Sequence, residues 1–251
     1  MLFMCKPIER KMKMLKISHL TKHYAGSQKG ITDLTLHIEP GDLYAFIGHN
    51  GAGKTTTLKA VAGIHDFESG EILVDGISMK DNAVDCKKNI AYIPDNPDLF
   101  EYLTGIQYLN FIADVFAISL NIRKEKIKEY ADAFEITEAL GNLISTYSHG
   151  MKQKLAIISA LIHSPKLVIF DEPFVGLDPK ATVTVKKYMR ELCASGGAVF
   201  FSTLVLEVAD KLCNKVAIIK AGKLVVSGKM SDVVKEGASL ESIFMEVAID
   251  E

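Results

Sequence analysis

The residues with the clearest chemistry in this sequence form a glycine-rich run at 48–55, which reads G-H-N-G-A-G-K-T. The run matches the pattern G-x-x-x-x-G-K-[ST]. Its glycines allow the tight and left-handed conformations that turn successive backbone N–H groups toward an anion at a helix N-terminus. The lysine adds a charge for the β- and γ-phosphates, and a threonine hydroxyl is a ligand that magnesium accepts. We therefore predict a loop that binds a nucleoside triphosphate with Mg²⁺, through His49, Asn50, Gly51, Ala52, Gly53, Lys54, Thr55 and Thr56.

Two adjacent acids end the apolar stretch 167–172, which reads L-V-I-F-D-E. Ligands of open α/β sheets bind at the carboxyl ends of the strands, so both acids are placed for chemistry. We expect Asp171 to hold magnesium, directly or through water, and Glu172 to polarise the water that attacks the γ-phosphate. The alternative for such a pair is a solvated turn. For the glycine-rich run the alternative is an ordinary turn, whereas a dinucleotide site is disfavoured because no G-x-G-x-x-G is present there.

The elements around these motifs alternate between strand and helix. Residues 43–47 are a short continuous apolar run, typical of a strand covered on both faces, and a helical stretch at 55–62 follows the loop. Further buried-type strands are predicted at 167–170, 198–201 and 215–219, with helices at 180–192 and 206–212 between them. This alternation implies a parallel sheet.

The remaining patterns predict further strands and a helical part. Strands are expected at 31–38, 71–74 and 89–93, a hairpin around 221–222, and helices from 104 to about 162. We predict an α/β fold with a parallel-sheet core, an N-terminal antiparallel β-subdomain and an inserted α-helical subdomain. One domain would span residues 1–251, with the nucleotide-binding core at 14–96 and 164–251 and the helical subdomain at 97–163.

The composition limits the class of protein and the kinds of partner. At 251 residues, with 48% hydrophobic and 24% charged residues, the chain lies in the range of folded globular domains. The 29 Lys and Arg nearly balance the 31 Asp and Glu, so we predict no nucleic-acid partner. The apolar run at 155–162 is far shorter than the roughly 20 residues of a membrane-spanning helix. Residues 1–13 lack the apolar core of a signal peptide, so we expect a cytoplasmic protein.

A further segment, 147–154, lies just before the strand that carries the acids and reads Y-S-H-G-M-K-Q-K. It resembles the signature motif of ATP-binding cassette ATPases. The resemblance covers nearly the whole chain, from L-T-K-H-Y at 20–24 through S-G-E-I-L-V-D-G at 69–76 to G-L-D-P at 176–179. Several linked motifs in this order are far more specific than one alone. The implied nucleotide is ATP, bound with Mg²⁺.

The resemblance assigns expected roles outside the glycine-rich run. Tyr24 would stack on adenine, although a lone tyrosine near a turn is usually just a partly buried side chain. Ser148, Gly150 and Met151 of the signature would close over the γ-phosphate bound by the opposite subunit of a cassette dimer. Asp178 would lie in the loop that crosses the dimer interface. For Ser148 and Asp178 the plainer alternative is a helix N-cap.

The sequence departs from the family pattern at four positions, and the departures at Asp95 and Leu204 bear on catalysis. Asp95, in I-P-D-N-P, stands where members commonly carry the glutamine that senses magnesium and the attacking water, and we expect it to take both roles. His149 and Met151 replace the commonest signature residues, as in the branch of exporter and antibiotic-resistance ATPases. Leu204 stands where a histidine normally follows Ser-Thr, and leucine donates no hydrogen bond to a γ-phosphate. Loss of such a donor commonly costs about 10²- to 10³-fold in rate, so hydrolysis is expected to be slow.

The sequence thus predicts an ATP-hydrolysing subunit that drives a separate integral-membrane permease. It would work as a homodimer, or as a heterodimer with another cassette ATPase, on the inner face of the cell membrane. One alternative is a nucleotide-gated binding module with weak or no hydrolysis, which Leu204 would allow. Another is a soluble ATPase that acts on ribosomes or DNA, but relatives of that kind usually carry two cassettes or long coiled coils.

Overall fold

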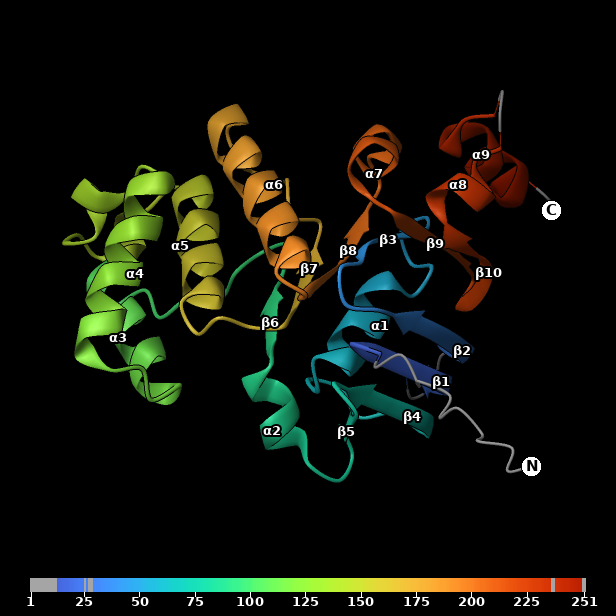
Figure 1. Cartoon of the computed structure of the whole chain (residues 1–251), viewed down its shortest axis with the longest axis horizontal. Helices are drawn as coiled ribbons and strands as arrows, with labels where there is room; N and C mark the ends of the chain where they lie inside the picture. The colour runs from blue at the N-terminus through green and yellow to red at the C-terminus, as the bar shows by residue number, and fades with distance from the viewer. Residues whose placement is uncertain (1–12, 25, 27–28, 236–237, 250–251) are drawn as a thin grey trace, which may run out of the picture.

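The computed structural model of the chain describes residues 13–24, 26, 29–235 and 238–249, and its framework consists of two β-sheets (Figure 1). The first sheet has four strands in the order β2-β1-β4-β5, and each neighbouring pair is antiparallel. Its strands are β1 (Leu15–His23), β2 (Gly30–Ile38), β4 (Ser69–Val74) and β5 (Ile77–Ser78). This sheet confirms the predicted antiparallel part. The prediction about a signal peptide falls almost entirely on residues 1–12, outside the described residues.

The second sheet has six strands in the order β10-β9-β3-β8-β7-β6. All neighbours are parallel except the edge pair β9 and β10, which form the predicted hairpin. Its strands are β3 (Leu43–Ile47), β6 (Ile90–Ile93), β7 (Leu167–Asp171), β8 (Ala198–Thr203), β9 (Lys215–Lys220) and β10 (Lys223–Lys229). The predicted parallel-sheet core is therefore confirmed.

The central strands β3, β7 and β8 are buried on both faces, which explains why they read as continuous apolar runs. Side chains alternate between the faces along each strand. In β8, Val199 and Phe201 belong to the core cluster that also contains residues of the helices between 105 and 212. Phe200 belongs to the other core cluster, which includes the antiparallel sheet. The register of the sheet aligns these layers, because Phe200 lies opposite Tyr44 of β3 and Ile169 of β7.

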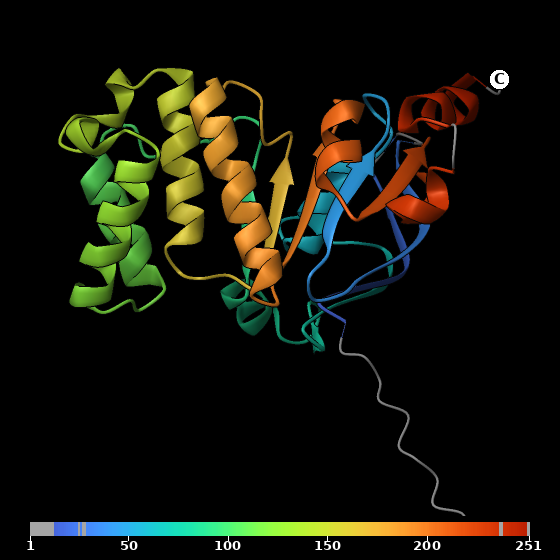
Figure 2. The same cartoon turned by 45° about the horizontal axis from the view of Figure 1, so that its top comes forward.

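The helices complete the layers of the fold (Figures 1 and 2). Helix α1 lies between the two sheets, and α6 and α7 cover the opposite face of the parallel sheet. Helices α3, α4 and α5 gather at the end of the molecule farthest from the antiparallel sheet, where α5 lies beside α6. The helices are α1 (Lys54–Val61), α2 (Ala83–Lys88), α3 (Gly105–Val115), α4 (Leu120–Ala133), α5 (His149–Leu161), α6 (Pro179–Ala194), α7 (Leu206–Leu212), α8 (Met230–Val233) and α9 (Leu240–Ile249).

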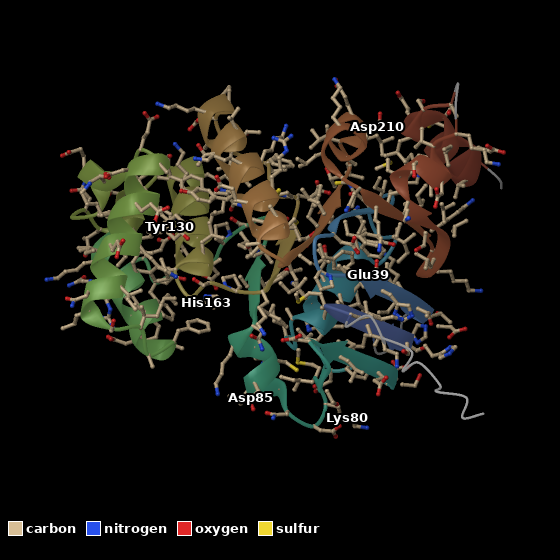
Figure 3. The ribbon with its side chains drawn as sticks, viewed as in Figure 1. Glu39, Lys80, Asp85, Tyr130, His163 and Asp210 are labelled. Carbon is tan, nitrogen blue, oxygen red and sulfur yellow. The ribbon has the colours of Figure 1, made fainter. Side chains whose placement is uncertain are left out.

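His163 joins the helical part to the parallel sheet (Figure 3). Its ring stacks on Phe116 with 3.8 Å between the ring centroids, and its Nε2 lies 3.2 Å from the carbonyl oxygen of Ile90 in β6. Burial lowers the pKa of His163 to about 4, so the ring stays neutral. The helices predicted between 104 and 162 are confirmed as α3, α4 and α5, while the proposed subdomain limits at 97 and 163 stay a prediction. Among the described residues, no helix is both long and apolar enough to cross a membrane.

Candidate functional site

The glycine-rich loop and the acid pair lie at the same edge because they follow β3 and β7, two parallel strands of one sheet with β8 between them. The carboxyl ends of β3, β8, β7 and β6 lie along one edge of the sheet. There, Ile47 lies opposite Thr203, and Asp171 lies opposite Ser202. The loop begins directly after Ile47, so it starts two strands away from Asp171. This edge is where open α/β sheets bind their ligands.

The backbone of the loop explains the positions of its glycines. A Cβ atom on Gly48 would lie 2.5 Å from the carbonyl oxygen of Ile219, so no side chain fits there. Gly53 is the N-cap of α1 and has φ of 108°, in the left-handed region that favours glycine. The N–H of Gly222 donates to the carbonyl of Ala52 at 2.9 Å, which ties the loop to the β9–β10 turn. Helix α1 thus begins with its free N–H groups at the loop, as an anion site requires.

Lys54 holds its ammonium group inside the loop. The residue is only 7% exposed, and Nζ donates to the carbonyls of Gly48 at 2.6 Å and His49 at 3.4 Å. Burial lowers the pKa of Lys54, and the nearby carboxylates of Glu172 and Asp171 act in the opposite direction. A buried ammonium at the N-terminus of a helix suits a ligand with several negative charges.

Asp171 is positioned by two hydroxyl groups. Its side chain is 3% exposed, Oδ2 accepts from Thr55 Oγ1 at 2.6 Å, and Oδ1 accepts from Ser202 Oγ at 2.5 Å. Ser202 Oγ also accepts the backbone N–H of Glu172 at 3.0 Å, so one serine holds both acids in place. Sequence reasoning assigned no role to Ser202, although its place just before Thr203 and Leu204 was a usable signal.

Glu172 has an unusual backbone and a perturbed carboxyl group. Its φ is 50°, uncommon for a residue with a side chain and typical of strained functional sites. Burial raises the pKa of Glu172, against the opposing effect of Lys54 and of the N–H of Leu204, which donates to Oε2 at 3.3 Å. A raised pKa brings a carboxylate closer to the range in which it works as a general base. The Leu204 side chain itself is 44% exposed and offers no polar group.

The oxygen atoms at this edge fit a magnesium ion shared with phosphates. A carboxylate and a hydroxyl, from Asp171 and Thr55, already lie together, and Asp95 lines the same cleft. Oδ1 of Asp95 accepts the backbone N–H of Asn96 at 2.8 Å. Among the described residues, no group of three or more His, Cys, Asp or Glu could hold a metal alone. Magnesium is commonly bound by one or two carboxylates together with substrate phosphates and water. The oxygen atoms of Asp171, Thr55 and Asp95 agree with this coordination.

A cleft of about 300 Å³ connects these groups, a size suited to a small-molecule ligand. Tyr24 forms part of its wall, is 42% exposed, and places its hydroxyl 3.2 Å from Thr56 Oγ1. Lys29 and Gly30 also line the cleft and were not expected there. The full lining consists of Tyr24, Lys29, Gly30, His49, Asn50, Gly51, Gly53, Lys54, Thr55, Thr56, Asp95, Asp171 and Glu172.

The signature residues and Asp178 are absent from the lining of this cleft. Ser148 caps α5, where its Oγ accepts the N–H of Met151 at 3.3 Å, and a Cβ atom on Gly150 would lie 2.8 Å from the carbonyl oxygen of Gly176. Asp178 caps α6 by accepting the N–H of Ala181 at 2.8 Å, and it pairs with Lys154 of α5 at 2.6 Å. The two helix N-termini are therefore tied together. Their contact with nucleotide stays a prediction that needs a second subunit.

His49 makes a contact that the sequence did not indicate. Its ring lies against Phe244 of α9, with 4.8 Å between the centroids. Phe244 is buried in the core cluster, so the C-terminal helix is in direct contact with the glycine-rich loop.

Comparison with known proteins supports a single family. Residues 31–175, more than half of the chain, match the family model described as ABC transporter. An uncharacterized ABC transporter ATP-binding protein, YhcH of Bacillus subtilis (strain 168), is 33% identical over 84% of this chain and 68% of its own length. The linearmycin resistance ATP-binding protein LnrL of the same organism is 29% identical over 88% of this chain and 70% of its own length.

Solved structures agree with these relatives. A structure described as the ATP binding subunit of an ABC transporter has a TM-score of 0.89 and 31% identity, and the match covers 94% of this chain and 99% of the other. A dimeric ATP-binding cassette in a post-hydrolysis state, bound to ADP and phosphate, has a TM-score of 0.79 at 22% identity, covering 86% of this chain and 99% of that chain, and shows the fold alone. Together these matches lead to one conclusion: this chain belongs to the ABC transporter family, as an ATP-binding subunit.

Proposed function

We propose that this chain binds MgATP in the cleft at the carboxyl edge of its parallel sheet and hydrolyses it. The observation that carries the proposal is the convergence of Lys54, Thr55, Asp171 and Glu172 on one cleft. The loop N–H groups and the Lys54 ammonium would neutralise the phosphates, and Tyr24 would lie against the adenine. Catalysis of phosphoryl transfer to water rests mainly on such positioning and charge neutralisation.

Each acid would have its own role in hydrolysis. Asp171, Thr55 and Asp95 would hold magnesium, which supplies charge neutralisation at the phosphate oxygens. Glu172 would accept a hydrogen bond from the attacking water and take its proton, since its raised pKa suits a general base. The backbone N–H of Leu204 keeps the Glu172 carboxylate oriented, but the leucine side chain adds no donor for the γ-phosphate. Turnover is therefore expected to be slow rather than absent.

We further propose that two cassettes close over two ATP molecules and that closure acts on an integral-membrane permease. The link between the N-terminal parts of α5 and α6 supports this proposal. Through the ion pair of Lys154 with Asp178, the signature residues Ser148, Gly150 and Met151 would move together with the loop of Asp178, which is predicted to cross the dimer interface. The relatives named as ABC transporter ATP-binding proteins support a permease partner, and LnrL supports a place near the antibiotic-resistance branch. The chain would then work at the cytoplasmic face of the cell membrane.

Calorimetry with ATP, with and without Mg²⁺, together with measurement of phosphate release, tests the first proposal. We expect magnesium-dependent ATP affinity in the wild type, slow phosphate release, and no release in Glu172→Gln, which keeps the shape of the site. Tight magnesium-dependent binding with phosphate release equal to that of Glu172→Gln would favour a binding module that does not hydrolyse. Absence of any magnesium-dependent affinity would overturn the proposed function. Co-purification with a polytopic membrane protein, as opposed to ribosomes, tests the partner.

A further inference from the structure

Tyr92 of β6 carries a polar group that the described site does not use. Its hydroxyl oxygen is buried and has no hydrogen-bond partner among the described residues. A buried hydroxyl that has lost water and gained no partner is unfavourable for folding. Such groups are uncommon in native proteins, and each calls for an explanation. The surroundings of Tyr92 offer one.

Tyr92 and Asp171 lie on the same face of the parallel sheet. Strands β6 and β7 are parallel neighbours, and Tyr92 lies opposite Ile169. Because side chains alternate, Ile169 and Asp171 point to one face, the face that α1 covers. Tyr92 packs against the same cluster, which includes Leu58 of α1. Tyr92 and Asp171 are thus diagonal neighbours, about 8 Å apart at the backbone given a strand spacing of about 4.8 Å and a rise of about 3.3 Å per residue.

The two groups also have complementary hydrogen-bonding capacity. Burial raises the pKa of Tyr92, and the charges of Asp171 and Asp95 raise it further, so the hydroxyl keeps its proton. Asp171 accepts one bond on each oxygen, from Thr55 and Ser202, while an ionised carboxylate has about four acceptor positions. Acceptor capacity therefore remains on Asp171, and magnesium usually brings several waters into its site.

We propose that Tyr92 is a positioning residue of the MgATP site, whose hydroxyl donates through a water of the MgATP complex to the Asp171 carboxylate. The inference rests on the proposed function, and it adds a residue that lies in neither the glycine-rich loop nor the acid pair. The hydroxyl would be satisfied only when MgATP is bound. Its effect should therefore appear in the magnesium dependence of binding and not in the stability of the nucleotide-free protein.

Tyr92→Phe removes only the hydroxyl, and Tyr44→Phe is a matched control. Tyr44 is buried in the same core cluster, but its hydroxyl has a partner, Ser227 Oγ at 2.8 Å. Three quantities are measured for both variants and for the wild type: the Mg²⁺ concentration for half-maximal ATP binding, the Kd for ATP in EDTA, and the Tm without nucleotide.

For Tyr92→Phe we expect the Mg²⁺ midpoint to rise about 2- to 10-fold, the range that one uncharged hydrogen bond gives. The Kd in EDTA should stay the same, and the Tm should stay the same or rise, because an unsatisfied hydroxyl is gone. Tyr44→Phe should lower the Tm and leave the Mg²⁺ midpoint unchanged.

An unchanged Mg²⁺ midpoint in Tyr92→Phe overturns the inference, and so does an equal loss of affinity in EDTA, which would mean a structural role. Both outcomes presuppose that the wild type binds ATP in a magnesium-dependent way. A wild type without that dependence would instead overturn the proposed function itself, so the two failures are distinguishable.

Discussion

Thr55→Val is the most direct test of where magnesium binds, because valine keeps the branched shape and removes one oxygen. In the structure that oxygen donates to Asp171 Oδ2 at 2.6 Å, a hydrogen bond to a charged group. Such bonds contribute about 1.5–3 kcal/mol when the environment is preserved. If the same oxygen is a magnesium ligand in the complex, affinity for MgATP should fall about 10- to 150-fold. Thr55 is exposed to the cleft, so water replaces part of the loss without nucleotide, and stability should fall by only about 0.5–1.5 kcal/mol.

The assay is ATP binding by calorimetry at several Mg²⁺ concentrations, with urea unfolding of the nucleotide-free protein beside it. Thr57→Val is the control, since Thr57 lies two residues further along α1, is fully buried and donates to the Gly53 carbonyl at 2.9 Å. It should lower stability by a similar amount, about 0.5–1.5 kcal/mol, with no magnesium effect. Thr55→Ser, which keeps the hydroxyl, should restore most of the affinity. If Thr55→Val binds MgATP within about threefold of the wild type, the placement of magnesium at Thr55 and Asp171 is refuted.

Three further outcomes follow from the same site. Leu204→His should raise steady-state phosphate release by up to about 10²-fold with little change in ATP affinity, and an unchanged rate would show that the missing donor is not what limits turnover. Since burial raises the pKa of Glu172, its charged form costs stability at neutral pH, so Glu172→Gln should unfold at a higher temperature than the wild type at pH 7.5. That advantage should shrink as the pH falls through the raised pKa, where the wild-type carboxyl gains its proton, and a difference in Tm that does not vary with pH would contradict the assignment. Phe244→Leu should weaken ATP binding because Phe244 supports the ring of His49. A double-mutant cycle with His49→Ala should give a coupling energy of about 0.5–1.5 kcal/mol, and additive effects of the two substitutions would show that Phe244 does not act through His49.

Much of the framework could be predicted from the sequence because the local signals agree with the fold. Strands buried on both faces read as short apolar runs, and β3 has the predicted bounds, residues 43–47. Strand β1 and helix α2 are among the elements that were missed. Strand β1 lacks a clean alternation because its pairing shifts register between Ile17 and Leu20 and again before Lys22, and His19 has φ of 50°. Helix α2 has only six residues, too few for a helical period to stand out.

The sequence by itself determined which local groups exist, because the glycine-rich loop at 48–55 contains glycines, a lysine and a threonine that lie close together in the chain. Only the tertiary structure decided what those groups meet. Ser202 joins both acids because β8 lies beside β7, and Tyr92 shares a face with Asp171 because β6 lies on the other side. The contact of Phe244 with His49 depends on where the C-terminal helix packs. Neighbours of this kind are set by strand order and layer packing, which bring together residues far apart in the chain and leave no periodic pattern to read.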